Sequence, residues 1–280
     1  QAHIAGTETE ETEETPEETE ATPEETEATP EETEATPEET EETPEESTGE
    51  MIDVELDFQV ALEGPYKNYS GLMDNELHDK VLFPLNHPYS QPPYNHYGTE
   101  SLDEVSTYMV DWILVEARSG VPEQNVNSPS TVVVETQAAI LLRNGDIVNP
   151  EGDKLEFSLI EGEPYYFVIR HRNHLDIMTA VPLEAEEDME YNFTSGIEQA
   201  YGLQQQKLNA NNKSMMIAGD YNHDGIIQVT DYETWLLSPA LLNVYSDADG
   251  NLDGLTQISD ADIWLPNKAR VGIVEIQYAP

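Results

Sequence analysis

Two segments near the C-terminal end contain the residue types, at the spacing, that bind a hard cation. Each presents side-chain oxygens at its positions 1, 3 and 5, a glycine at position 6 and a carboxylate at position 12. Calcium takes about six to eight oxygen ligands, and a tight loop of this pattern supplies them, with position 7 adding a backbone carbonyl and position 9 a direct or water-mediated ligand. Because every expected donor is an oxygen, the pattern favours calcium over zinc or copper.

The sequence therefore predicts two calcium ions, one in each of two loops. The expected ligands are Asp220, Asn222, Asp224, Ile226, Gln228 and Asp231 in the first loop, and Asp249, Asn251, Asp253, Leu255, Gln257 and Asp260 in the second. Trp235 and Trp264 each follow the last ligand by four residues. Two copies with one spacing arise by chance less easily than one, which favours calcium over the alternative of plain solvated turns. A helix is expected to leave each loop, and Pro266 is expected to end the second helix.

Strands are the elements expected to position these loops. The segment 52–62 alternates apolar and acidic residues with a period of two, as in a half-buried strand. Further strands are expected between clear turn signals, at 109–116, 131–142, 155–160, 165–170 and 177–182. Short strands at this spacing predict a mainly β protein, an antiparallel β-sandwich. The link 66–100 is expected to wrap over the sandwich as an ordered loop.

Four regions are expected along the chain: an acidic Thr/Pro/Glu repeat stalk (1–50), a β-sandwich domain (51–215), a tandem calcium-loop module (216–268) and a C-terminal strand (269–280). In the stalk, Thr-Pro-Glu-Glu-Thr recurs every seven residues from Thr15 to Thr36. The recurring proline and the lack of large apolar residues exclude a coiled coil and predict an extended, non-globular segment. Its threonines are either O-glycosylated or bare, and the sequence leaves both readings open.

Composition excludes several classes of function. The 280 residues include 58 Asp and Glu against 11 Lys and Arg, with no cysteine. So acidic a surface repels nucleic acid, which is not expected as a partner. No apolar run approaches the roughly 18–20 residues of a transmembrane segment. No nucleophile elbow, phosphate-binding glycine loop or zinc-protease motif occurs, so the chain is not expected to be an enzyme. The start at Gln1 suggests a secreted protein that has lost its signal peptide, although a chain cut there for another reason would look the same.

Three other features have two readings each. The run Arg170–His174 either forms structural hydrogen bonds and ion pairs, which we favour, or binds a metal or shuttles protons in catalysis. An aromatic cluster on the long link (His87, Tyr89, Tyr94, His96 and Tyr97) either packs on the sandwich, which we favour, or contacts sugars. The terminal segment 271–280 either closes its own sandwich, which we favour, or adds a strand to a neighbouring copy and so builds a filament.

The tandem arrangement of a loop followed by one helix resembles a type I dockerin, with EF-hand-like loops. The preceding region is similar to a hemagglutinin-like C-terminal module of Bacteroidota surface proteins. The stretches that carry this second resemblance are 60–66, 83–89, 95–100, 110–116 and 168–175. The resemblance implies an exported, cell-surface location. We therefore expect a secreted, calcium-stabilised structural or adhesive protein of the cell surface. One form of this hypothesis is that the chain is the subunit of an extracellular filament. The alternative is a module of the lectin or dockerin type that binds surface glycans or proteins.

Overall fold

The computed structural model describes residues 49–123, 130–238 and 242–277, which belong to one compact unit. The predicted stalk lies outside the described residues, except for Gly49 and Glu50. The strands are β1 (Met51–Gln59), β2 (Tyr66–Lys67), β3 (Leu72–Met73), β4 (Met109–Ser119), β5 (Val132–Leu142), β6 (Ile147–Val148), β7 (Leu155–Ile160), β8 (Pro164–His171), β9 (His174–Met178), β10 (Leu183–Glu184), β11 (Asp188–Asn192), β12 (Gln206–Leu208), β13 (Ser214–Met216), β14 (Ile226–Ile227) and β15 (Arg270–Val271). The helices are α1 (Glu76–Asp79), α2 (Val229–Leu237) and α3 (Ile258–Asn267), with 3-10 turns at Ile197–Gln199 and Val274–Ile276. The prediction of a mainly β chain is confirmed.

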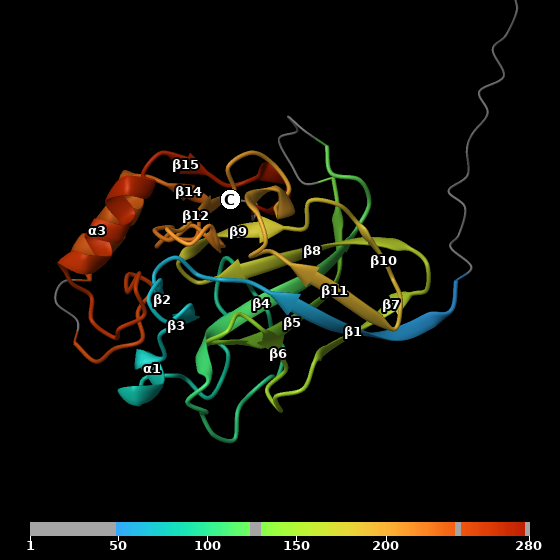
Figure 1. Ribbon diagram of the computed structural model, residues 1–280, viewed down its shortest axis with the longest axis horizontal. Coiled ribbons are helices and arrows are strands. Elements are labelled where there is room, and N and C mark those ends of the chain that lie inside the picture. Colours follow the sequence, from blue (N-terminus) through green and yellow to red (C-terminus); the bar gives the residue numbers. More distant parts are fainter. Residues whose placement is uncertain (1–48, 124–129, 239–241, 278–280) are drawn as a thin grey trace, which may run out of the picture. The chain divides into compact units, whose positions relative to one another are not determined.

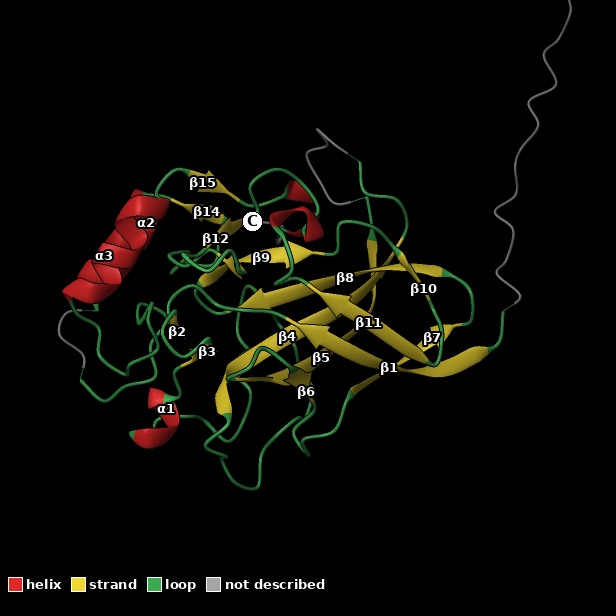
Figure 2. Cartoon of the chain, viewed as in Figure 1, coloured by secondary structure: helices red, strands yellow, loops and turns green. Residues whose placement is uncertain are grey.

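Two sheets form a β-sandwich (Figures 1 and 2). One has the strand order β11-β1-β7, and the other has the order β10-β8-β4-β5-β6 with β9 also paired to β8. Pairing between the described strands is antiparallel, apart from the parallel pair β1–β11. The sheets meet through aromatic rings: Phe58 of β1 and Phe157 of β7 lie 5.1 Å and 6.0 Å from Phe167 of β8, measured between ring centroids. The predicted sandwich is therefore confirmed.

The strand β1 follows from the alternation of apolar and acidic residues in its sequence. The mostly apolar sequence of β4 fits a strand that is buried on both faces. In β1 the side chains of Val54, Leu56 and Phe58 are buried, while the acidic residues between them are exposed. In β4 every residue but the last is buried, including charged ones, because the long link covers the outer face of its sheet. The Trp112 indole donates to the Pro84 carbonyl at 2.8 Å, and the Tyr89 hydroxyl donates to the Trp112 carbonyl at 2.7 Å. The long link is thus an ordered cover, as expected.

Five of the six expected strands are confirmed as β1, β4, β5, β7 and β8. The sixth, expected at 177–182, is wrong in its second half, since β9 ends at Met178. The reason is that the Ala180 amide donates to the Gln199 carbonyl at 3.0 Å, so the chain turns away from β8 there.

The C-terminal segment is not the continuous strand that was expected over 269–280. Arg270 and Val271 pair with β14, and the chain then forms the 3-10 turn Val274–Ile276; residues 278–280 lie outside the described residues. Two contacts hold this turn on its own sandwich: the Glu275 carboxylate accepts from the Ser130 amide at 2.8 Å, and Arg170 donates to the Ile276 carbonyl at 2.7 Å. Those side-chain contacts outweigh the strand propensity of the segment.

The second loop helix is also longer than expected. α3 runs past Pro266 to Asn267, because a proline in the last turn removes only one hydrogen bond near the helix end. The Asn267 side chain then fixes that end by donating to the Ala218 carbonyl at 2.8 Å. In the described part of the chain, no helix is both long and apolar enough to cross a membrane. The division between a sandwich (51–215) and a calcium-loop module (216–268) stays a prediction.

Candidate metal centre

The first loop, residues 220–231, is folded around two carboxylates. Asp220 accepts the backbone amides of Asp224 at 3.2 Å and Gly225 at 3.0 Å. Asp231, at the start of α2, accepts the amides of Tyr221 at 2.8 Å and Gln228 at 2.7 Å. One carboxylate oxygen each from Asp220, Asp224 and Asp231 lies within 4.8 Å of the others. The first loop therefore brings its predicted carboxylate ligands together.

The second loop, residues 249–260, repeats these bonds at equivalent positions. Asp249 accepts the amides of Asp253 at 3.0 Å and Gly254 at 2.7 Å. Asp260 accepts the amides of Gly250 at 2.9 Å and Gln257 at 2.8 Å. The middle ligands match as well: the oxygens of Asn222 and Asn251 accept the amides two residues ahead, at 3.2 Å and 3.0 Å. The 29-residue sequence repeat is thus a repeat of backbone geometry.

Left-handed backbone angles make both turns tight. Gly225 and Gly254, at position 6, have φ of +77° and +74°, a conformation that glycine adopts without strain. Position 4 is also left-handed, with φ of +60° at His223 and +59° at Leu252. The glycine requirement follows from the sequence, whereas the second left-handed residue carries no sequence signal.

Each loop holds two buried carboxylates, and their burial is unfavourable without a cation. The residues Asp231, Asp249 and Asp260 are fully buried, and Asp220 is 4 % exposed. Burial raises the pKa of Asp231 and Asp260 to about 6 and that of Asp249 to about 7. The pKa of Asp220 lies well above its ordinary value, because of burial and then repulsion from Asp231 and Asp176. A bound calcium ion would neutralise these charges, and the oxygen-only donor set fits that ion.

The remaining predicted ligands stand at the edge of each loop. The amides of Ile226 and Leu255, at position 7, donate to the Asp224 and Asp253 carboxylates at 2.9 Å and 2.8 Å. The ligand role of their carbonyls stays a prediction. At position 9, the side-chain amides of Gln228 and Gln257 donate to those same two carboxylates, at 3.1 Å and 3.3 Å. Direct coordination by either glutamine would require its amide to turn the oxygen inward.

The two loops are joined to each other through their helices, α2 and α3, which lie side by side (Figure 2). The Trp235 indole of α2 donates to the carbonyl of Gln257, and the Trp264 indole of α3 donates to the carbonyl of Gln228, at 2.9 Å and 3.1 Å. The Tyr221 hydroxyl of the first loop donates to the Asp260 carbonyl of the second at 2.9 Å. Because each loop supports the other, a change in one loop should reach the second.

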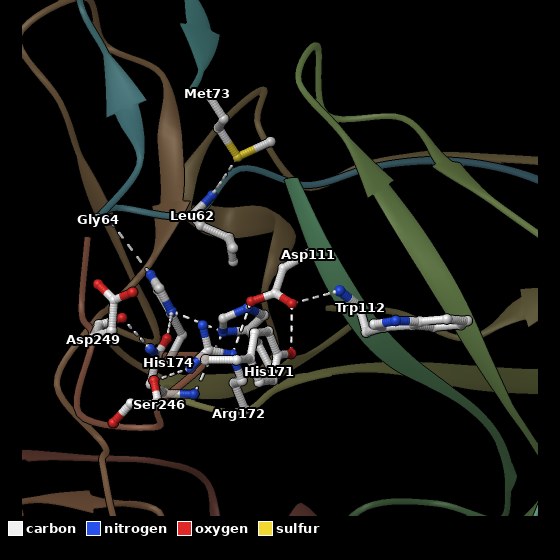
Figure 3. A network of polar contacts seen from close by, with 12 residues as sticks. Leu62, Gly64, Met73, Asp111, Trp112, His171, Arg172, His174, Ser246 and Asp249 are labelled. Atoms are coloured by element: carbon white, nitrogen blue, oxygen red, sulfur yellow. Dashed lines mark hydrogen bonds and ion pairs between the residues drawn. The ribbon is translucent and has the colours of Figure 1, made fainter. Parts of the chain in front are cut away.

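A buried polar network ties the second loop to the sandwich (Figure 3). Arg172 pairs with Asp111 of β4 at 2.9 Å, stacks 4.0 Å from the centroid of the Tyr245 ring, and donates to the Ser246 carbonyl. Tyr245 completes a cycle, because its hydroxyl donates to Asp111 at 2.6 Å. Burial works against ionisation of Asp111, but Arg172 and His171 outweigh it, so its pKa lies below the ordinary value.

The rest of the Arg170–His174 run joins the same network. The Asn173 side chain donates to the Asp249 carbonyl at 2.7 Å, and the His171 and His174 rings lie 4.8 Å apart. Burial lowers the pKa of both histidines, that of His174 to well below its usual range. Arg170 pairs with Glu116 at 2.5 Å. The run therefore makes structural hydrogen bonds and ion pairs, the reading we favoured.

A second anchor lies beneath the first loop. The Glu63 carboxylate accepts from the Ala218 amide at 3.1 Å and from the Asn267 side chain at 2.6 Å, and it pairs with Lys207. These contacts join the end of α3 to the sandwich. No local pattern in the sequence marks Glu63, Tyr245 or Ser246, because their contacts join residues that lie far apart in the chain.

Comparison with known proteins gives little further guidance. No protein-family model and no curated protein matches the chain. Among solved structures, the chain is similar to one from a type II cohesin–X-dockerin complex of Acetivibrio cellulolyticus with a mutated N-terminal interface. The identity is 12 %, the match covers 80 % of this chain and 98 % of that one, and the TM-score is 0.35. A chain from the C-terminal interface mutant of that complex is 14 % identical. That match covers 78 % of this chain and 97 % of the other, with a TM-score of 0.37. A likeness at these scores does not establish a shared function.

Proposed function

We propose that each loop binds one calcium ion and that the chain is a calcium-stabilised, non-catalytic structural or adhesive protein of a cell surface. The observation that carries the proposal is the repeated scaffold of the loops, in which equivalent backbone amides hold equivalent buried carboxylates. Two independent turns would have no reason to share these bonds. Each ion would supply positive charge to a loop whose carboxylates otherwise repel one another.

The position of the loops supports a structural role for calcium. The second loop rests on the Arg172 network and the first on Glu63, while the helices that leave the loops bond to each other. An ion that orders both loops would therefore stabilise the contact between the helices and the sandwich. The surface location rests on the Bacteroidota resemblance and on the acidic stalk, which we propose to be an exposed, O-glycosylated or bare spacer.

The candidate partners are proteins, with a second copy of the chain as one case. Filament assembly by strand addition would require the C-terminal segment to leave its own sandwich, where Glu275 and Arg170 hold it. One observation favours a second function, a dockerin-like protein-binding module. Several apolar side chains on the loop helices are more than half exposed in this structure: Val229 61 %, Leu236 56 %, Leu237 83 % and Ile258 66 %.

Thermal unfolding of the full chain, with light scattering, tests this proposal. Calcium at about 100 times its Kd stabilises a protein by about 2.7 kcal/mol per site, which is about 5–10 °C for a chain of this size. Magnesium, which dehydrates reluctantly, serves as the control ion and should give a much smaller rise. The doubly substituted variant Asp231→Asn, Asp260→Asn should lose the calcium response.

The outcomes separate the candidates. A calcium-dependent rise with growth in particle size favours the filament, and a rise at constant size favours the binding module. If the melting temperature is the same with calcium, with magnesium and after metal removal, the loops are ordinary turns and the proposal is wrong.

A further inference from the structure

A second, chemically different cluster lies on the long link that covers β4 and β5. It consists of His87, His96 and Glu100, and one ligand atom from each of the three lies within 4.8 Å of the others. His96 Nε2 is 2.9 Å from Glu100 Oε1, and His87 Nε2 is 3.8 Å from Glu100 Oε2. The side chains are 5 % exposed for His87, 11 % for His96 and 21 % for Glu100. The cluster is therefore enclosed, with access to solvent on the side of Glu100.

The sandwich fixes the orientation of these three side chains. Glu100 Oε1 also accepts the Ala138 amide of β5 at 2.9 Å. Burial works against ionisation of Glu100, but this amide and His96 outweigh it, so its pKa lies below the ordinary value. The His87 ring lies 6.2 Å from the Trp112 ring of β4 and 5.0 Å from the His96 ring, between centroids. The carboxylate and the imidazoles thus converge on one point.

Two further observations favour a bound ion at this point. Glu100 Oε2 is buried and accepts no hydrogen bond from any described residue. Gly98 lies directly beneath, and a Cβ at that position would overlap both Glu100 Oε2 and His96 Nε2. A buried carboxylate oxygen without a donor is costly unless a cation completes it.

We propose that His87, His96 and Glu100 bind a zinc ion. Ligands about 2.0–2.1 Å from a tetrahedral zinc are about 3.3 Å apart. His87 Nε2 lies 3.8 Å from Glu100 Oε2, and His96 Nε2 lies 2.9 Å from the other carboxylate oxygen, Oε1, so the two imidazoles flank the carboxylate near this spacing. Two imidazole nitrogens with one carboxylate suit zinc and not calcium, which takes oxygen ligands. Three protein ligands leave the fourth position to water. The zinc site is independent of the calcium loops.

Zinc binding would exchange existing contacts for metal bonds. His96 Nε2 would give up its hydrogen bond to Glu100, and His87 Nε2 would give up its 3.1 Å contact with the Gly98 carbonyl. The His87 proton would then move to Nδ1. A protonated Nδ1 could no longer accept the 3.3 Å hydrogen bond that the Tyr89 amide donates to it. Both nitrogens already lie within 3.8 Å of a Glu100 carboxylate oxygen. The ion would clamp the long link to β4 and β5.

Zinc titration of the metal-stripped full chain by calorimetry, with calcium in excess to occupy the acidic loops, tests the proposal. We expect one zinc ion per chain and a higher melting temperature. His96→Gln should weaken zinc binding by more than about 100-fold, since even an outer partner of a zinc ligand contributes about 10- to 100-fold. Gly98→Ala retains every ligand but fills the space between them, so it should have a similar effect.

His78→Gln is the matched control, because His78 pairs with Asp79 at 2.9 Å and takes no part in the cluster; its zinc affinity should equal that of the wild type. A preserved calcium response would show that each variant is folded. Cobalt bound to the wild type should give the strong visible absorption of a four-coordinate ion. The proposal is overturned if the wild type takes up no zinc, if cobalt is six-coordinate, or if His96→Gln and Gly98→Ala bind zinc as tightly as the wild type.

Discussion

Replacing Arg172 by methionine is expected to destabilise the fold far more than removal of any exposed charge. The guanidinium is 1 % exposed and pairs with an Asp111 carboxylate that is fully buried. Methionine is similar in length but leaves that carboxylate without its main cation. The variant also loses the stacking on Tyr245 and the hydrogen bond to the Ser246 carbonyl, just ahead of the second loop.

The size of the effect follows from these contacts. Removing one partner of a buried ion pair costs about 3–5 kcal/mol, chiefly because the other charge stays buried. At about 2–4 °C per kcal/mol for a chain of this size, the melting temperature should fall by about 6–20 °C. Because Asn173 and Arg172 hold the backbone of the second loop, calcium affinity should fall there more than at the first loop.

Differential scanning calorimetry in excess calcium measures this loss. Lys154→Met is the control, since Lys154 pairs with Asp188 at the surface at 2.8 Å, where solvent screens the charge; its melting temperature should stay close to that of the wild type. Adding Asp111→Asn to Arg172→Met removes the stranded charge and should recover part of the loss. If Arg172→Met melts no lower than Lys154→Met, or if the added asparagine destabilises it further, our account of the network is wrong.

Three further predictions concern the loops and the C-terminal segment. The rise in melting temperature caused by calcium should become smaller as the pH is lowered from about 7.5 to about 5. Thermal unfolding with and without calcium at each pH measures this. In the metal-free chain, the pKa is raised to about 6 for Asp231 and about 7 for Asp249. These raised pKa values stabilise the metal-free fold fully below the unfolded pKa of 3.8, and that stabilisation is lost as the pH rises through 6 to 7. A calcium effect that does not change with pH would contradict this. Gly225→Ala forces a side chain into φ +77° and should cost about 1–2 kcal/mol and weaken calcium binding in a titration, whereas Gly152→Ala, at φ +93° with open space around it, should leave calcium binding unchanged. Glu275→Gln should loosen the C-terminal turn at a cost of about 1–3 kcal/mol and speed hydrogen exchange of the Gln277 amide, which donates to the Val274 carbonyl at 3.2 Å. Exchange at the wild-type rate would show that the carboxylate does not hold the turn.

Local patterns in the sequence predicted those elements whose cause is local. Period-two alternation identified β1, and the loop spacing identified the carboxylates that the fold brings together in the first loop. The C-terminal segment shows the limit of such patterns. Its apolar alternation favours a strand, but the contact of Glu275 with Ser130, 145 positions away, determines its conformation.

The supports of the candidate site could not be predicted in this way. Arg172 and Ser246 are 74 positions apart, and neither has a motif that points to the other. Two of the three residues of the proposed zinc site, His87 and His96, could be noticed in the sequence as part of the aromatic cluster on the long link. Glu100 completes the cluster only through the fold, in which the Ala138 amide of β5 orients it.

Calorimetric titration of the metal-stripped full chain with calcium tests whether the two loops bind this ion. The account predicts two calcium ions per chain, and fewer in Asp231→Asn, whose substitution removes the closing ligand of the first loop. Because the helices couple the loops, the ion that remains in that variant should bind more weakly than in the wild type. Absence of calcium binding, or an unchanged stoichiometry and affinity in Asp231→Asn, would contradict the claim.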